Sequence, residues 1–226
     1  MIIGNGLIAS LFTEHDRENV IFFASGVSNS LETRDNEFLR EENLIRTTIK
    51  ENPNKIFIYF STCSIYDSSK TESQYVLHKL KMEQIIAELC PQYLILRVSN
   101  AVGKGGNPNL LMNYLIRSVK SGENINVHTK ATRNLIDTED IKNITLLLLE
   151  KQELNKIVNL AYLENYSIIE ILQIIEKFFN LKINLNLIKA GSGYDISISD
   201  IENYFIEHQL TNKETYLCRI LEKYYA

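Results

Sequence analysis

The sequence predicts an α/β protein in which helices cover both faces of a parallel β-sheet. Up to residue 160, short apolar runs alternate with longer amphipathic segments. The runs are apolar at nearly every position, which is typical of parallel strands that are buried on both faces. A glycine-rich turn follows the first run, and such turns join a strand to a helix in sheets of this kind.

The first half of the chain predicts four strands and three helices. Apolar residues three and four positions apart indicate the helices, continuous apolar runs indicate the strands, and Pro53 marks a break. The expected order is strand 1–3, helix 7–15, strand 19–24, helix 36–50, strand 55–60, helix 72–89 and strand 93–98.

The second half of the chain is less regular. The segment Gly103–Asn109 is rich in glycine and asparagine and predicts a loop. Asp137 or Thr138 is expected to cap a helix, and Ser167 with Glu170 has the spacing of a capping box. The expected elements are helix 110–121, strand 126–128, the helix after the first cap, strand 158–160, a helix from 167 and a final helix 215–225.

Composition and charge exclude several classes of protein. The net charge of −4 and the pI near 5.7 give no basic surface for nucleic acid. No apolar run is long enough to cross a bilayer, and no signal peptide precedes the first strand. The three cysteines and four histidines are scattered, without the spacing of metal ligands. We therefore expect a reduced, cytoplasmic protein with no metal site, no nucleic-acid partner and no membrane association.

Tyr75 and Lys79 are the candidate acid–base pair. Residues four apart share one face of a helix, so both side chains can reach the same point. An adjacent ammonium lowers the pKa of a phenol, which is about 10 when free, by favouring the phenolate. Thr62 ends the apolar strand before this helix, and its hydroxyl is placed to orient a substrate oxygen. The spacing Tyr-x-x-x-Lys also occurs by chance in helices that carry no active site. The strand that ends at Thr62 and the glycine turn are therefore what favours a catalytic role for this pair.

Gly4, Gly6 and Ala9 form a G-x-G-x-x-A pattern in the first strand-to-helix turn. Gly4 allows the tight turn, Gly6 lets a phosphate approach the backbone, and Ala9 lets the helix pack close to the strand. The amides at the start of the helix would then bind a pyrophosphate. A turn with a purely structural role would carry the same residues.

The order of these motifs resembles the extended short-chain dehydrogenase/reductase family, which comprises NAD-dependent sugar-nucleotide epimerases, dehydratases and reductases. The resemblance spans nearly the whole chain and implies a Rossmann-like sheet, an NAD or NADP cofactor and a nucleotide-sugar substrate. The segments that carry it are Gly4–Ala9, Ser61–Tyr66, Tyr75–Lys79, Leu94–Gly103, Arg133–Asp140 and Val158–Ala161 with Ser167 and Glu170.

The resemblance also implies roles for the residues of the catalytic and cofactor sites. Tyr75 would be the acid/base, Lys79 would lower the pKa of that tyrosine and hold the nicotinamide ribose, and Thr62 would bind the reacting oxygen. The implied cofactor contacts are Gly4, Gly6, Leu7, Ile8, Ala9, Ala24 and Ser25.

Three further residues would contact the sugar nucleotide. They are Ser64, Asn100 and Arg133, the last as a charge partner of the diphosphate. Two alternatives stay open, because Asn100 would also suit a plain turn and Arg133 a surface ion pair.

The chain departs from the family in its first third. The family carries an acidic or basic residue about 20 residues past the glycines, on a second strand that contacts the adenosine ribose. Here strand 19–24 instead resembles the family's fourth strand, because the strand ending in hydroxyls follows one helix later. Two strands and a helix are therefore missing. Their loss predicts that the first strand lies at the sheet edge, that the adenine pocket is largely absent, and that dinucleotide binding is weak, different or lost.

Further departures lie near the candidate site. The segment between Tyr66 and Tyr75, which helps to cover the substrate in the family, is short. Cys63 and Ser64 stand where dehydratases of the family carry an acid pair, so elimination has no obvious general acid. We interpret Cys63 as a packing residue and expect His78 to face away from the site.

These observations predict two domains. Residues 1–105, with 125–160 completing the sheet, would form a truncated Rossmann-like domain, and 106–124 with 161–226 a substrate-binding lobe. A homodimer would form through the apolar face of helix 72–89, unless that face packs on the sheet. The residues concerned are Met82, Ile85, Ile86 and Leu89.

Two functional hypotheses follow. The first is an NAD(P)-dependent epimerase or reductase that acts on a nucleotide-activated sugar, in surface polysaccharide biosynthesis. The second is a degenerate relative that binds a nucleotide, a sugar nucleotide or a partner protein without redox chemistry. The missing strands favour the second hypothesis, and the intact set of Thr62, Tyr75 and Lys79 favours the first.

Overall fold

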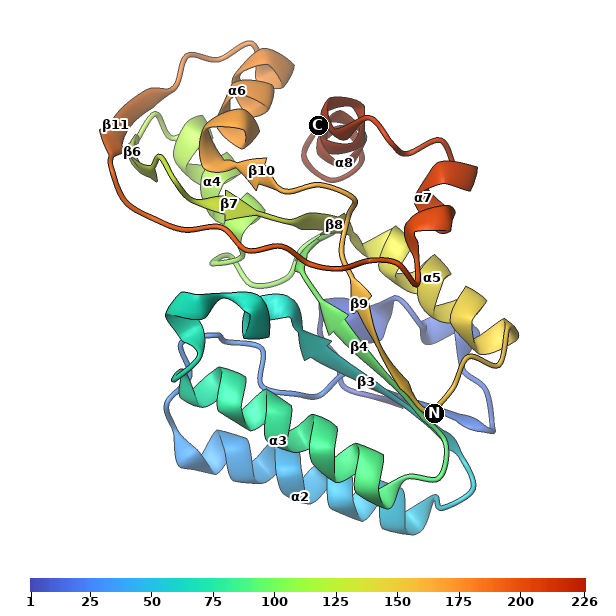
Figure 1. Cartoon of the computed structure of the whole chain (residues 1–226). Coiled ribbons are helices and arrows are strands. Elements are labelled where there is room, and N and C mark those ends of the chain that lie inside the picture. Colours follow the sequence, from blue (N-terminus) through green and yellow to red (C-terminus); the bar gives the residue numbers. More distant parts are fainter. The chain divides into compact units, whose positions relative to one another are not determined.

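The computed structural model describes residues 1–226, which form two compact units (Figure 1). The chain passes from the first unit to the second and back before it ends in the second. Unit 1 comprises Met1–Val98 and Glu139–Leu160, and unit 2 comprises Ser99–Thr138 and Ala161–Ala226.

Unit 1 is built on a five-stranded sheet in which all neighbouring strands run parallel. The strand order is β1-β2-β3-β4-β9. The predicted fold class, a parallel sheet flanked by helices, is confirmed. The strands are β1 (Ile2–Ile3), β2 (Val20–Phe23), β3 (Ile56–Thr62), β4 (Tyr93–Val98) and β9 (Lys156–Leu160).

Strand β1 lies at the edge of this sheet, as the missing strands predict. It pairs with β2 alone, where Ile2 lies opposite Phe22 and Ile3 opposite Phe23. In the complete fold, with strand order 3-2-1-4-5-6, the first strand is central, and the strand that contacts the adenosine ribose lies next to it on one side. Here the sheet ends at the strand that carries the glycine turn.

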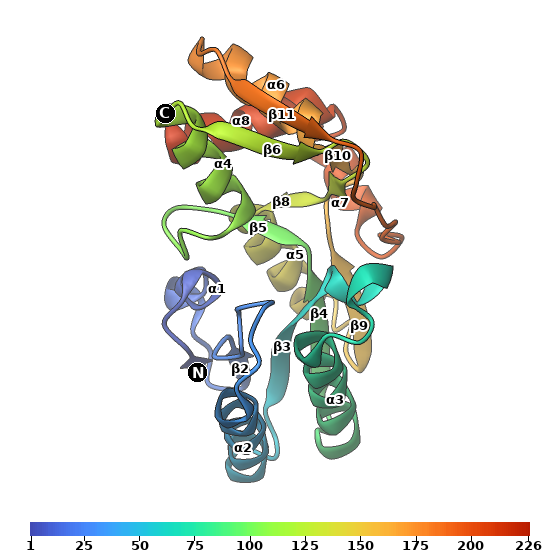
Figure 2. The same cartoon turned by 90° about the vertical axis from the view of Figure 1, so that its left-hand side faces the viewer.

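Alternate residues of β2 and β3 face opposite sides of the sheet. Phe12, which follows the first helix, contacts Phe22 and Phe60, with ring centroids 4.3 and 5.5 Å away. Phe23 and Tyr59 instead belong to the core on the side of α2 (Asp35–Glu51) and α3 (Gln74–Leu89). Figure 2 shows α1 and α3 on opposite sides of β3. Because both faces of the sheet are covered by apolar side chains, these strands are apolar at nearly every position of the sequence.

Helices α2 and α3 lie side by side on one face of the sheet (Figure 1). Met82, Ile85 and Ile86 of α3 are buried in the core between these helices and the strands. Leu89, at the end of α3, is 46% exposed. Of the two arrangements considered for this apolar face, the structure therefore shows packing against the sheet.

The first helix is shorter than predicted. Instead of one helix over 7–15, α1 covers Leu7–Ser10 and a separate 3-10 helix covers Thr13–His15. The break lies at Phe12, whose fully buried ring stacks on Phe22 of the sheet. A helix of four residues has a small dipole, so anion binding at this turn depends on the backbone of the glycines.

Unit 2 combines helices with three two-stranded sheets around an aromatic core. Tyr162 stacks on Tyr216 with ring centroids 3.9 Å apart, and Phe205 meets Tyr162 edge-on. The predicted capping box of Ser167 and Glu170 is confirmed at the start of α6. The elements are β5 (Asn100–Val102), α4 (Leu111–Lys120), β6 (Asn124–His128), β7 (Thr132–Arg133), β8 (Leu135–Asp137), β10 (Tyr166–Ser167), α6 (Ile168–Phe179), β11 (Asn184–Ile188), α7 (Glu202–Glu207) and α8 (Lys213–Tyr225).

Only part of the segment 125–160 completes the large sheet. From this segment, β9 joins β4, and α5 (Thr138–Glu150) leads back into unit 1. Strands β6, β7 and β8 pair instead with β11, β10 and β5 in unit 2. The role of unit 2 as a substrate lobe remains a prediction. None of the helices combines the length and the hydrophobicity that crossing a bilayer requires.

Candidate active site

Tyr75 and Lys79 lie four residues apart on α3, which begins at Gln74. Both are buried, with 7% and 2% of their surface exposed. Tyr75 belongs to a buried apolar cluster with Val76 and with Val27, from the loop after β2, and Ile65 packs against this cluster. These contacts place the start of α3 at the carboxyl ends of β2 and β3, the edge where parallel sheets bind ligands.

Thr62 is the last residue of β3, and its hydroxyl is held by the turn that follows. The side-chain oxygen accepts a hydrogen bond from the backbone N–H of Ser64 at 3.0 Å. This bond caps a 3-10 helix at Cys63–Tyr66, and Ile65 of this helix packs against the apolar cluster that contains Tyr75. The structure thus brings Tyr75 to the turn that Thr62 opens.

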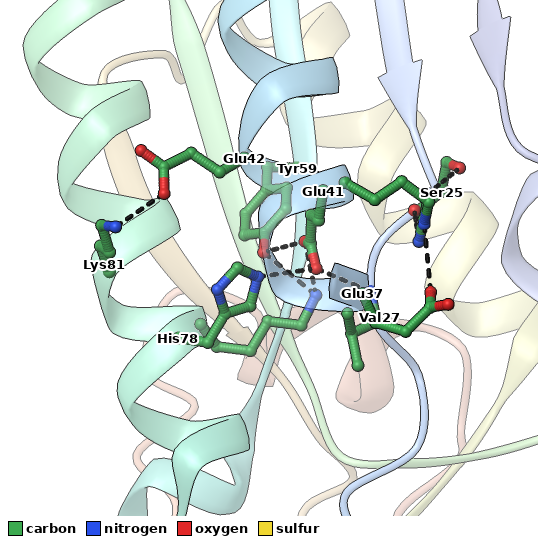
Figure 3. Close-up of polar contacts among 10 residues, drawn as sticks. Ser25, Val27, Glu37, Glu41, Glu42, Tyr59, His78 and Lys81 are labelled. Carbon is green, nitrogen blue, oxygen red and sulfur yellow. Dashed lines mark hydrogen bonds and ion pairs between the residues drawn. The ribbon is translucent and has the colours of Figure 1, made fainter. Parts of the chain in front are cut away.

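The ammonium of Lys79 is bound by two groups of unit 1. Its Nζ donates to Glu41 Oε1 and to the Tyr59 hydroxyl, each at 3.0 Å. Glu41 comes from α2 and Tyr59 from β3, as Figure 3 shows, so the hydrogen bonds of Lys79 join α3 to both of these elements. Lys79 therefore donates its hydrogen bonds to Glu41 and Tyr59 and not to the Tyr75 hydroxyl.

Glu41 is a fully buried carboxylate that accepts four hydrogen bonds. Tyr59 and Lys79 donate to Oε1, and the N–H of Val27 and Nε2 of His78 donate to Oε2. Burial alone would raise the pKa of the Glu41 carboxyl. The Lys79 charge and the donors from His78, Val27 and Tyr59 outweigh burial and hold this pKa well below its usual range.

The expectation that His78 faces away from the site is wrong. His78 is buried and its Nε2 lies 3.0 Å from Glu41 Oε2, on the same carboxylate that binds Lys79 (Figure 3). A carboxylate only accepts hydrogen bonds, so Nε2 carries the proton. The His78 side chain points toward α2. The consecutive α3 residues His78 and Lys79 therefore bind the same carboxylate, that of Glu41.

Sequence reasoning missed Glu41, although one signal was present. On α2, Phe38, Ile45 and Ile49 recur at helical spacing and form the buried face, and Glu41 lies in the same stripe. A charged residue inside an apolar stripe is rarely buried without a partner. The partner lies on another helix, which periodicity within α2 does not identify.

Gly26 encloses the Glu41–Lys79 pair from the loop after β2. A Cβ at this position would lie 2.5 Å from Lys79 Nζ and 2.6 Å from Glu41 Oε1. Any larger residue would displace the ammonium or the carboxylate. The ion pair therefore leaves room only for glycine at position 26 of the loop after β2.

The glycine turn has the geometry that a phosphate-binding turn needs. Gly4 adopts φ +124°, and a Cβ there would overlap the carbonyl oxygen of Ala24. Around Gly6 a Cβ would meet no atom within 4 Å, so the backbone is open to an approaching group. Ala9 is 2% exposed and lets α1 pack on the sheet.

Ser25 and Ser64 extend the same edge of the sheet. Arg40 of α2 donates to the backbone oxygen of Ser25 at 3.1 Å, which fixes the loop after β2. The backbone oxygen of Ser64 accepts from the N–H of Asp67. The proposed ligand contacts of these serines, and those of Leu7 and Ile8 on α1, remain predictions.

Cys63 follows Thr62 at the end of β3 and is fully buried. Burial raises the pKa of its thiol to about 12, and its Sγ bonds the carbonyl oxygen of Arg97 at 3.0 Å. A thiol that remains protonated is a poor nucleophile. The structure therefore supports the interpretation of Cys63 as a packing residue.

Asn100 and Arg133 belong to unit 2. The Asn100 side chain donates to the backbone oxygen of Asn134 at 2.7 Å, and Arg133 donates to the backbone oxygens of Thr132 and Ser192. Both side chains brace neighbouring backbone within unit 2. Their proposed contacts with a sugar nucleotide remain predictions.

The match to a known family covers most of the chain. A sequence model described as "NAD dependent epimerase/dehydratase family" matches residues 4–161. This range contains the glycine turn, Thr62, Tyr75 and Lys79, and it agrees with the resemblance predicted from the order of the motifs. No curated protein matches the chain.

Several solved structures share the fold at low sequence identity. UDP-glucuronic acid 4-epimerase from Bacillus cereus, in complex with UDP-glucuronic acid and NAD, is 19% identical with a TM-score of 0.75, over 98% of this chain and 77% of that one. RMD from Pseudomonas aeruginosa, complexed with NADPH, is 14% identical with a TM-score of 0.72, over 91% and 80%. UDP-N-acetylglucosamine 4-epimerase from Methanobrevibacter ruminantium M1, in complex with UDP-N-acetylmuramic acid, is 15% identical with a TM-score of 0.68, over 91% and 78%.

Proposed function

The chain belongs to the NAD dependent epimerase/dehydratase family, and on this premise we propose that it is an NAD(P)-dependent epimerase or reductase of a nucleotide-activated sugar. One observation carries the proposal: Tyr75 and Lys79 share a face of α3 at the turn opened by Thr62, and the Lys79 ammonium is paired with the buried carboxylate of Glu41. These are the groups that proton transfer to a sugar hydroxyl requires.

The three residues divide the proton chemistry between them. Thr62 Oγ1 already accepts a bond from Ser64, so its own proton is left to donate to the reacting sugar oxygen. Tyr75 takes the proton of the sugar hydroxyl when that carbon is oxidised and returns it when the carbon is reduced. Lys79 supplies a positive charge one turn further along the same face of α3.

The residues present fit part of a nicotinamide dinucleotide. The backbone at Gly6 is open to a pyrophosphate, and the ammonium of Lys79 has the chemistry to bind a ribose hydroxyl. The sheet ends at β1, so no further strand is present to hold the adenosine ribose. When bound, the nicotinamide would supply the hydride acceptor and donor. We expect the affinity for the dinucleotide to be lower than that of a complete fold of this kind.

The substrate is proposed to be a UDP-sugar. Structures of the same fold were solved with UDP-glucuronic acid and with UDP-N-acetylmuramic acid. In this chain Arg133 would pair with the diphosphate, and Asn100 and Ser64 would contact the nucleotide sugar. Elimination of water is not proposed, because Cys63 is a protonated thiol and Ser64 is no acid. A role in surface polysaccharide biosynthesis is part of this proposal.

The test is epimerisation of UDP-glucuronic acid and UDP-N-acetylglucosamine with NAD⁺, and reduction of a UDP-4-keto sugar with NADPH. We expect the C4 epimer in the first assay or the C4 alcohol in the second, followed by NMR of the sugar protons. The Lys79→Met variant, prepared in parallel, should be inactive and so exclude a contaminating enzyme. Absence of turnover in both assays would contradict the proposal.

One observation favours a second candidate function. The edge position of β1 removes the binding surface for adenosine, which suits a relative that binds a nucleotide sugar without redox chemistry. Under this alternative, UDP-sugars would raise the melting temperature, whereas NAD⁺, NADH and their phosphorylated forms would have no effect at millimolar concentration. A shift with the dinucleotides would exclude it.

A further inference from the structure

We propose that Glu41 and Tyr59 are positioning residues, which fix the Lys79 ammonium in one orientation and leave a single N–H for the reaction site. The inference rests on the proposed function, because it concerns the lysine of that site. It adds two residues that neither the motif Tyr-x-x-x-Lys nor the glycine turn contains.

The count of hydrogen bonds on Lys79 is the first step. An ammonium has three N–H donors. Glu41 Oε1 and the Tyr59 hydroxyl take two of them, each at 3.0 Å, and the same Nζ lies 4.9 Å from the centre of the Tyr59 ring. A free lysine side chain samples many rotamers, and two bonds plus burial restrict it to one. One donor then remains for a ligand.

The second step is the fixed position of Glu41 itself. Its two oxygens accept four bonds, at distances from 2.6 to 3.0 Å, which is the full capacity of a carboxylate. The donors come from the loop after β2, from β3 and from α3. Glu41 can move only by breaking bonds to all three parts, so it is a rigid anchor for the lysine.

The third step concerns Tyr59, which bonds both members of the pair. Burial, together with the adjacent Glu41 charge, raises the pKa of the Tyr59 phenol well above its usual value. The phenol therefore stays protonated, donates to Glu41 at 2.7 Å and accepts from Lys79. For the same reason Tyr59 is unsuited to act as the acid/base, and Tyr75 keeps that role.

The fourth step is a comparison between two ion pairs on the same helices. Glu42 follows Glu41 on α2 and binds Lys81 on α3, but the Lys81 side chain is 58% exposed. An exposed pair of this kind contributes little. A buried ion pair is weak evidence for stability, because apolar residues of similar size often serve as well. The charge at Glu41 is therefore better explained by its effect on Lys79, whose ammonium it holds in one orientation.

The experiment measures hydrogen exchange of the lysine ammonium groups by ¹⁵N NMR, without cofactor or substrate. A buried and bonded ammonium exchanges slowly with water and gives a signal at neutral pH. We expect such a signal from Lys79, assigned by its loss in Lys79→Arg. It should persist in Glu42→Gln, and exchange at least about tenfold faster in Glu41→Gln. If Glu41→Gln does not fold, Tyr59→Phe, which removes one acceptor of Lys79, should show a smaller increase.

Unchanged exchange of Lys79 in both Glu41→Gln and Tyr59→Phe would overturn the inference. In the turnover assay, the positioning role predicts a kcat lower by about 10-fold to 100-fold in Glu41→Gln, with KM for the sugar nearly unchanged. Equal kcat values for Glu41→Gln and Glu42→Gln would also overturn it. A wild type that turns over no sugar would contradict the proposed function alone, because the exchange measurement still decides whether Glu41 and Tyr59 hold the lysine.

Discussion

Replacement of Tyr75 by phenylalanine is expected to lower kcat by about 10²-fold to 10⁴-fold, the usual contribution of a general acid–base group. The change removes one hydroxyl and keeps the ring, which belongs to the apolar cluster with Val27 and Val76. Binding of the nucleotide sugar should therefore be nearly unchanged, so the loss should appear in kcat rather than in KM. Steady-state kinetics with the substrate identified by the turnover assay would measure both values.

Tyr93→Phe is the matched control for this variant. Tyr93 begins β4, at the opposite end of the strand from Val98 and the candidate site. The loss of the Tyr93 hydroxyl should leave kcat within about twofold of the wild type, because the ring that packs against the core is kept and the residue lies away from the candidate site. If Tyr75→Phe retained a similar kcat, Tyr75 would not be the acid/base.

Replacement of Glu41 by glutamine is expected to destabilise unit 1 by about 3–5 kcal/mol. The change leaves the Lys79 ammonium, which is 2% exposed, without its counter-charge, and removal of one partner from a buried pair carries a cost of this size. Urea unfolding of the wild type and the variant would measure the difference. Glu42→Gln, which breaks pairs with the exposed Lys81 and Arg46, should cost less than about 1 kcal/mol.

Two extensions separate the charge effect from a loss of packing. In the double variant Glu41→Gln with Lys79→Met, the destabilisation should be smaller than the sum of the two single variants, because no unpaired charge remains. The effect should also depend on pH. The pKa of Glu41 is lowered by folding, so its contribution is present above the usual value near 4.5 and is lost as the pH falls below it. The stabilities of wild type and Glu41→Gln should therefore converge in acid, and a constant difference would contradict the ionised state of Glu41.

Much of unit 1 was predictable because its signals are local. Continuous apolar runs identified β2, β3 and β4. In unit 2, another local signal, a Ser–Glu spacing, identified the start of α6. The edge position of β1 followed from the order of motifs along the chain, since two strands are missing before the strand that ends at Thr62. The family membership was predicted from the same order.

The remaining features depend on contacts between distant parts of the chain. The early end of α1 is accompanied by the stacking of Phe12 on Phe22 of β2. The inward position of His78 depends on Glu41, which lies 37 residues earlier on another helix. The strands β5, β7, β8 and β10 have only two or three residues, too few to show a period of their own.

The most direct test of the account is a crystal structure with NAD⁺ and UDP-glucuronic acid bound. The account predicts that the pyrophosphate of NAD⁺ lies on the backbone at Gly6. It also predicts that Lys79 donates its third N–H to the nicotinamide ribose, and that the Tyr75 and Thr62 hydroxyls lie within about 2.6–3.2 Å of one sugar oxygen. Ligands bound with that oxygen out of reach of Tyr75, or a dinucleotide bound away from the glycine turn, would contradict it.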